Sequence, residues 1–222
     1  MYKTFPYDIK TYPFRDLVQE AFECDDLSRL HRQRADLVPQ YELNFDNEVK
    51  TAIHDVFYSK LRDDWTSFYQ TYDQFITQVV AKYVDEESFL YQSWPNFRCH
   101  LPGEQSVHRW HADGDAHHRH PAGEINFCIA ITRMFDTNTI WIESEPNKGD
   151  FFSMDQSYGE CTRFNGNQCV HGNKQNLTDV TRISFDLRVL PRSRYIEDDD
   201  TMTNNALRKF KIGSYYTEYC PC

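Results

Sequence analysis

The feature that most constrains the fold is a change in the spacing of apolar residues at about residue 86. Before that point apolar residues recur every three or four positions, the spacing of one face of a helix, and this pattern is strongest over Asn47–Leu61 and Ser67–Val84. Shorter helical patterns begin near Phe14 and just after Asp25 and Asp26, either of which can cap a helix through its side-chain oxygen. The first third of the chain is therefore predicted to be helical.

After residue 86 the apolar residues fall into short runs bounded by Pro, Gly and Asn. The runs with strand character are Phe89–Trp94, Phe97–Leu101, Val107–His111, Glu124–Thr132, Thr139–Glu143, Cys161–Asn165 and Thr181–Val189. Because no helical pattern separates them, we expect an antiparallel β-sandwich or jelly-roll barrel with the helices over one face. The expected division of this single domain is a helical part (1–85), a jelly-roll core (86–191) and a polar C-terminal tail (192–222).

Charge and composition exclude several classes of protein. The chain has 24 Lys and Arg against 34 Asp and Glu, a formal charge of −10, which argues against binding nucleic acid or an anionic membrane through a broad basic face. No stretch approaches the roughly 18 consecutive apolar residues of a membrane helix, and the first residues lack the apolar core of a signal peptide. The seven cysteines show no CxxC spacing, which favours free thiols. We therefore expect a cytoplasmic protein.

Two histidines and one carboxylate form a candidate metal site. His111 and Asp113 are two residues apart, so on an extended strand their side chains share a face, and His171 follows in the segment CVHGN. Two His and one carboxylate can occupy one face of an octahedral ion and leave three positions open, as in non-haem Fe(II) oxygenases. In a chain with nine histidines this spacing also arises by chance. The neighbouring histidine-rich turn, 117–120, is expected to be a solvated lid rather than a zinc site.

The segment Thr181–Val189 alternates between apolar and polar residues more regularly than any other part of the chain. One face is apolar, and the other carries Arg182, Ser184, Asp186 and Arg188. If the polar face meets solvent, this is an ordinary antiparallel strand. If it faces the mouth of a barrel, Arg182 and Ser184 offer a guanidinium group and a hydroxyl suited to a carboxylate.

Taken together, His111-x-Asp113, His171 and Arg182-x-Ser184 resemble the signature of the Fe(II)/2-oxoglutarate-dependent oxygenases. The wider sequence resembles the small oxygenases of aminoglycoside gene clusters, the streptomycin-biosynthesis type. The matching segments lie between Pro95 and Pro191 and read PNFRCHLPG, HADGD, HPAGEINFCIAIT, NTIWIESEPNKGDF and FNGNQCVHGNKQNLTDVTRISFDLRVLP.

The resemblance implies a double-stranded β-helix, a jelly roll of the cupin kind, in which His111, Asp113 and His171 hold Fe(II). It also implies that 2-oxoglutarate chelates the iron and that its far carboxylate meets Arg182, helped by Ser184. Reaction with O₂ then yields succinate, CO₂ and an oxidised substrate. Related iron halogenases have Gly or Ala in place of the carboxylate, so the retained Asp113 favours hydroxylation, desaturation or ring closure over halogenation.

Three further residues near the predicted site each have a functional and a structural interpretation. Asn126 can donate to the 2-oxoglutarate carboxylates or satisfy backbone groups at a strand end. Trp141 can wall the substrate pocket or belong to the core. Arg98 can bind an acidic substrate or the cosubstrate, or it can form a salt bridge with Glu143 or Asp186.

The expected substrate is a small molecule. Asp186 and Arg188 share a face with Arg182 and are candidates for binding substrate amino or carboxyl groups; alternatively they pair with each other or with neighbours. We expect a hydroxylase of a small polar metabolite, such as an amino acid, an amino sugar or a biosynthetic intermediate. One alternative is a hydroxylase of protein side chains. The other is a cupin-like isomerase or binding module without 2-oxoglutarate, which would need no carboxylate anchor at Arg182 and Ser184.

Overall fold

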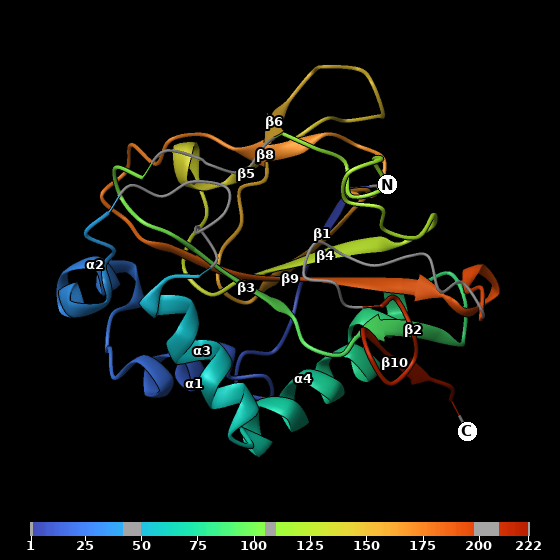
Figure 1. Ribbon diagram of the computed structural model, residues 1–222, viewed down its shortest axis with the longest axis horizontal. Helices are drawn as coiled ribbons and strands as arrows, with labels where there is room; N and C mark the ends of the chain where they lie inside the picture. The colour runs from blue at the N-terminus through green and yellow to red at the C-terminus, as the bar shows by residue number, and fades with distance from the viewer. Residues whose placement is uncertain (1, 42–49, 105–109, 198–208, 222) are drawn as a thin grey trace.

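The computed structural model describes residues 2–41, 50–104, 110–197 and 209–221. Two β-sheets and a group of helices form three layers, with the helices on one face of the larger sheet and the smaller sheet over its other face (Figure 1). Within these ranges no helix combines the length and the apolar composition needed to cross a membrane.

The predicted helices form in the N-terminal third. They are α1 (Phe14–Phe22), α2 (Leu30–Gln33), α3 (Ala52–Arg62) and α4 (Thr66–Gln78), with 3-10 turns at Leu27–Arg29, Ala35–Leu37 and Val80–Tyr83. Asp26 caps the first of these turns by accepting a hydrogen bond from the backbone N–H of Ser28, as the sequence predicts. Helix α3 corresponds to the predicted helix Asn47–Leu61, whose first residues, 47–49, lie outside the described ranges.

The larger sheet is antiparallel, with strand order β1-β7-β4-β9-β2-β10 and with β3 also paired to β9. Its strands are β1 (Lys3–Pro6), β2 (Phe89–Gln92), β3 (Asn96–His100), β4 (Ile125–Ala130), β7 (Glu160–Phe164), β9 (Arg182–Pro191) and β10 (Tyr216–Tyr219). The central strand is β9, which pairs with β4 along one edge and with β2 and β3 along the other.

The smaller sheet has the order β6-β5-β8 and is also antiparallel. Its strands are β5 (Ile140–Ile142), β6 (Phe152–Ser153) and β8 (His171–Asn173), and a 3-10 turn, Asp136–Asn138, precedes β5. An isolated antiparallel bridge pairs His111 with His171, the first residue of β8. The two opposed sheets confirm the predicted jelly roll with N-terminal helices. Of the predicted strand 107–111, residues 107–109 lie outside the described ranges.

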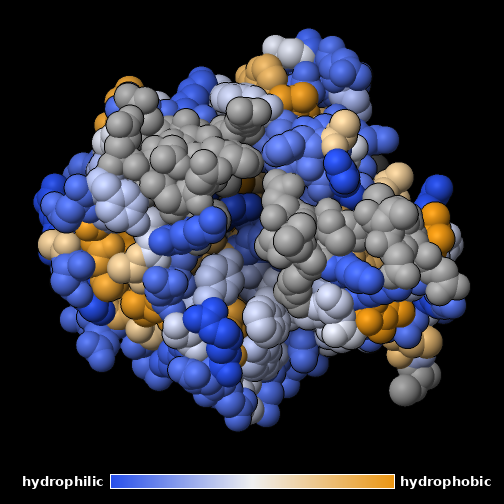
Figure 2. All heavy atoms as spheres, in the orientation of Figure 1, coloured by the Kyte–Doolittle hydropathy of each residue, from blue (hydrophilic) through white to orange (hydrophobic). Residues whose placement is uncertain are grey.

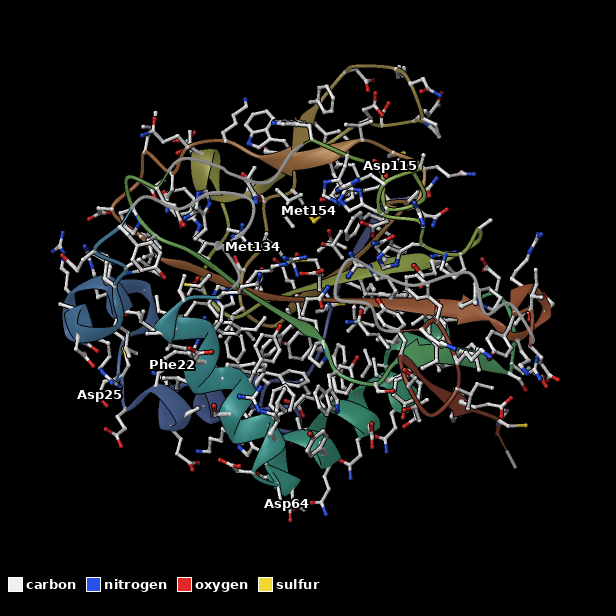
Figure 3. The ribbon with its side chains drawn as sticks, in the orientation of Figure 1. Phe22, Asp25, Asp64, Asp115, Met134 and Met154 are labelled. Carbon is white, nitrogen blue, oxygen red and sulfur yellow. The ribbon has the colours of Figure 1, made fainter. Side chains whose placement is uncertain are left out.

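Alternation along the strands divides the interior into two apolar cores. In β4, Phe127 and Ile129 join the core that the helices cover, whereas Cys128 and Ala130 face the smaller sheet. Met134 and Met154 lie between the two sheets, and Phe22 lies on the helical side (Figure 3).

The C-terminal region differs from the predicted polar tail. Strand β10 pairs with β2, and Tyr215 and Tyr216 are buried. A 3-10 turn, Arg192–Arg194, follows β9 directly. The end of the chain therefore closes one edge of the larger sheet, because its aromatic side chains pack on Leu90 and Leu190. Residues 198–208, which include part of the acidic run, lie outside the described ranges.

A substitution of Phe185 tests the packing of the core that the helices cover. Its side chain is fully buried, and its ring centroid lies 5.4 Å from that of Phe57 and 6.2 Å from that of Phe97. We expect Phe185→Ala to lower the free energy of unfolding by about 3–5 kcal/mol, because it leaves a cavity among these rings. The exposed Leu177 is the control, and Leu177→Ala should change stability by less than about 0.5 kcal/mol. Urea denaturation measures both, and similar effects for the two variants would contradict this account of the core.

Candidate metal centre

The structure brings His111, Asp113 and His171 together between the two sheets. One potential ligand atom of each residue lies within 4.8 Å of those of the other two. The two histidine backbones are joined by reciprocal N–H···O hydrogen bonds of 3.0 and 2.9 Å. All three side chains are largely buried, with Asp113 only 2% exposed. These three donors therefore converge at one point, as a metal site requires.

Asp113 is held in place by its own backbone and by that of Gly114. The N–H of Asp113 donates to Gly166 O at 2.9 Å, and the N–H of Gly114 donates to Asn167 O at 2.8 Å. A Cβ at residue 114 would lie 2.8 Å from Asn167 O, so this close approach requires a glycine. The turn after Asp113 is thus anchored to the loop before His171.

The ring of His171 is oriented so that one nitrogen is available to a metal. Its Nδ1 lies 3.1 Å from Cys169 O, which assigns the proton to Nδ1 and leaves the lone pair on Nε2. Burial lowers the pKa of His171 to about 4, so the imidazole is neutral at pH 7. A neutral imidazole is the form that binds a metal.

The histidine-rich turn, 117–120, was expected to be a solvated lid. Part of it packs against the metal ligands instead. The ring of His118 stacks on that of His111 with a centroid distance of 3.9 Å, and its Nδ1 lies 2.9 Å from Asp115 Oδ1. Asp115 lies on the loop beside this group of nitrogen-bearing side chains (Figure 3). His118 and Asp115 therefore support His111. These contacts were not predicted from the sequence, and only the three-residue spacing of Asp115 and His118 could have indicated one of them.

The second carboxylate oxygen of Asp113 receives hydrogen bonds instead of facing the histidines. Arg188 Nη2 and Nε donate to Oδ2 at 2.9 and 3.0 Å, and Asn126 Nδ2 donates to it at 2.7 Å. Burial by itself raises the pKa of Asp113, but the Arg188 guanidinium, together with the neighbouring His111 and His171, holds the pKa well below its usual range. Asp113 is therefore an anion in the folded protein.

The predicted substrate contacts Asp186, Arg188 and Arg98 line the cavity and also pair with one another. Asp186 Oδ1 accepts from Arg98 at 2.8 Å, and Asp186 Oδ2 accepts from Arg188 at 3.0 Å. The three side chains thus pair with one another, the structural alternative for each, because all three are mostly buried and their charges require compensation. Asn126 likewise contacts Asp113 and also lines the cavity, so its contact with a cosubstrate stays a prediction.

Arg182 is a buried cation held by neutral groups. Its guanidinium donates to Asn138 O at 3.1 Å, Ser184 Oγ at 3.0 Å and Asn173 Oδ1 at 3.1 Å. The residue is only 2% exposed, and burial lowers the pKa of its guanidinium. Among the residues that the structure describes, no carboxylate forms an ion pair with Arg182. A buried guanidinium of this kind is suited to an anionic ligand.

Arg182 and the two histidines line the same cavity, which opens to solvent. Its polar lining also includes Arg98, Asn126, Asn173, Asp186 and Arg188. The face in Figure 2 is mostly hydrophilic and is hollowed near its centre. The cavity lining does not include the predicted pocket residue Trp141, whose neighbour Ile140 points into the cavity instead. The Trp141 ring lies under the Lys174 ammonium, 3.1 Å from the ring centroid.

The donor set fits a non-haem Fe(II) ion, and the buried guanidinium of Arg182 lines the cavity beside it. Two imidazole nitrogens and one carboxylate oxygen form the facial arrangement with open positions that such iron sites use. Arg182 and Ser184 lie on the neighbouring wall.

Comparison with known proteins finds one curated relative that matches nearly the whole chain. No protein-family model matches it. The chain is 32% identical over 215 residues to the streptomycin biosynthesis protein StrG of Streptomyces griseus, with 97% of each chain covered.

Solved structures share the fold at low sequence identity. EctD from S. alaskensis, solved with bound Fe, superposes with a TM-score of 0.55 at 13% identity, covering 88% of this chain and 74% of that one. The non-haem α-ketoglutarate-dependent epimerase SnoN from nogalamycin biosynthesis has a TM-score of 0.53 at 15% identity, covering 95% and 89%. The chain therefore belongs to the family of the streptomycin biosynthesis protein StrG, and its fold is the jelly roll of the Fe(II)/2-oxoglutarate-dependent oxygenases.

Proposed function

We propose that the protein is an Fe(II)/2-oxoglutarate-dependent oxygenase. One observation carries this proposal. Arg182, a buried cation paired with no carboxylate among the described residues, lines the same cavity as His111 and His171, two of the three potential metal ligands. A metal site alone would suit many functions. A metal site beside a guanidinium that has no carboxylate partner among the described residues suits a metal-chelating dicarboxylate.

Each residue then has a defined task. His111, Asp113 and His171 hold Fe(II), and Arg182 with Ser184 binds the far carboxylate of 2-oxoglutarate. Bound Fe(II), 2-oxoglutarate and O₂ supply the oxidation, with succinate and CO₂ as products. The side chains of Ile140 and Phe164 form the apolar part of the cavity wall and exclude water from the site.

The substrate we propose is a small polar metabolite, such as an amino acid, an amino sugar or a biosynthetic intermediate, and the reaction is hydroxylation. The cavity lined by His111, His171 and Arg182 opens to solvent, so a small molecule can reach it. Charged and amide side chains on its wall favour a polar ligand. Two relatives support this class: StrG is a streptomycin biosynthesis protein, and EctD has been solved with 2-oxoglutarate and 5-hydroxyectoine.

Metal binding should depend on the three ligands. We expect the metal-free protein to bind one Mn(II), used as a stand-in for Fe(II), with an affinity that calorimetry can measure. His171→Ala should raise the Kd by more than the roughly 10- to 100-fold that changes outside the ligand shell produce, because it removes a ligand. His31→Ala is the matched control, since His31 contacts Thr181 away from the cluster. An unchanged Kd in His171→Ala would rule out this site.

Cosubstrate binding should depend on Arg182. Anaerobic addition of 2-oxoglutarate to the Fe(II)-loaded protein should give a weak visible charge-transfer band, and Arg182→Ala should raise the 2-oxoglutarate Kd roughly 30-fold or more with little change in metal affinity. Arg29→Ala, which removes an exposed ion pair with Asp179, should leave both constants unchanged. If metal binds but 2-oxoglutarate produces no band, the chain is a metal-binding cupin of another kind.

A further inference from the structure

The two oxygens of the Asp113 carboxylate have different surroundings. Oδ2 receives three N–H donors, two from Arg188 at 2.9 and 3.0 Å and one from Asn126 at 2.7 Å. Oδ1 faces the imidazoles instead, 3.4 Å from Nε2 of His111 and 3.8 Å from Nε2 of His171. A metal between the two rings therefore meets Oδ1, while Oδ2 is already occupied by hydrogen bonds.

The donors to Oδ2 come from two neighbouring strands. Asn126 on β4 and Arg188 on β9 are direct partners in the antiparallel register, so their side chains share the face toward the cavity. The Asn126 amide packs against Gly166, where a Cβ would lie 2.8 Å from its Cγ. Sheet pairing and the absence of a side chain at residue 166 thus place the amide beside Asp113.

Arg188 is itself held by a second carboxylate. Its Nη1 donates to Asp186 Oδ2 at 3.0 Å, and the same carboxylate accepts from Arg98 and from Asn96 at 2.8 and 3.0 Å. The Arg188 side chain is only 6% exposed. Because its guanidinium is held by carboxylates on two sides, it presents Nε and Nη2 to Asp113 in one orientation.

We propose that Arg188 and Asn126 are positioning residues that keep Asp113 as a monodentate metal ligand. This inference rests on the metal site of the proposed function. The role of the two side chains is to orient the Asp113 carboxylate, which differs from binding substrate or cosubstrate. They act through Asp113, because the contacts described above join them to its carboxylate.

The number of open positions on the metal depends on this constraint. With two imidazoles and one carboxylate oxygen, an octahedral ion has three positions left. A bidentate Asp113 would take one of them and leave two, which a chelating keto acid would fill completely. Holding Oδ2 away from the metal therefore preserves a position for the third reactant, O₂.

Two variants test the proposal without removing a metal ligand. Asn126→Ala deletes one neutral donor to Oδ2, and Arg188→Lys keeps the charge but loses the two-pronged contact. Arg188→Gln is the stronger change, but it leaves two buried carboxylates short of a partner and so risks unfolding. Arg192→Gln is the control, because Arg192 forms only exposed ion pairs just after β9.

The readouts use Mn(II) alone, without cosubstrate or turnover. Calorimetry gives the Kd, which we expect to rise about 10- to 100-fold in Asn126→Ala and Arg188→Lys but not in Arg192→Gln. Water-proton relaxation at saturating Mn(II) reports the number of water molecules bound to the metal. If Asp113 becomes bidentate in the variants, that number should fall from three to two, and the bound-state relaxivity should fall by about one third. Circular dichroism checks that each variant is folded.

The outcomes separate this inference from the proposed function. A Kd and a relaxivity equal to those of the wild type in both variants would overturn the positioning role. A weaker Kd with an unchanged number of waters would overturn the monodentate constraint. If the wild type binds Mn(II) but gives no complex with 2-oxoglutarate, the proposed function fails, and the Mn(II) comparison still decides the role of Arg188 and Asn126.

Discussion

The burial of charge on the polar face of β9 is the constraint on which the rest of the site depends. A buried ion is costly unless an opposite charge and hydrogen bonds compensate it. Asp186 and Arg188 meet this requirement by joining Arg98 and Asp113 in a row of alternating charges. Arg182, at the other end of the same face, has only neutral partners among the described residues. The charge left over in the cavity is therefore positive and lies at Arg182.

The same strand also connects the site to the helical layer. Its apolar face, which includes Phe185 and Leu187, packs into the core that α3 and α4 cover, while its polar face lines the cavity. A strand that is buried on both sides has little freedom to move, and it is paired along both edges. Such a scaffold suits a site whose ligands must be held to within a fraction of an ångström.

Much of the fold could be predicted because long segments with a clear period leave few choices. The helices α3 and α4 and the strands β4 and β9 follow directly from their apolar spacing. The short strands β1 and β8 were missed, because neither KTFP nor HGN shows the run of apolar residues that marked the other strands. Strand β10 was not predicted within the polar tail, because its conformation depends on pairing with β2, which is distant in sequence.

At the site, the sequence by itself determined which residue types could act: two histidines and a carboxylate at the spacing of a metal site, and an arginine with a serine beyond them. Tertiary structure decided what the other polar residues do. Asn126 and Arg188 contact Asp113, and His118 stacks on His111. The physical reason is that a polar side chain bonds to whatever lies opposite it, and cross-strand register, which no local pattern specifies, sets that neighbour.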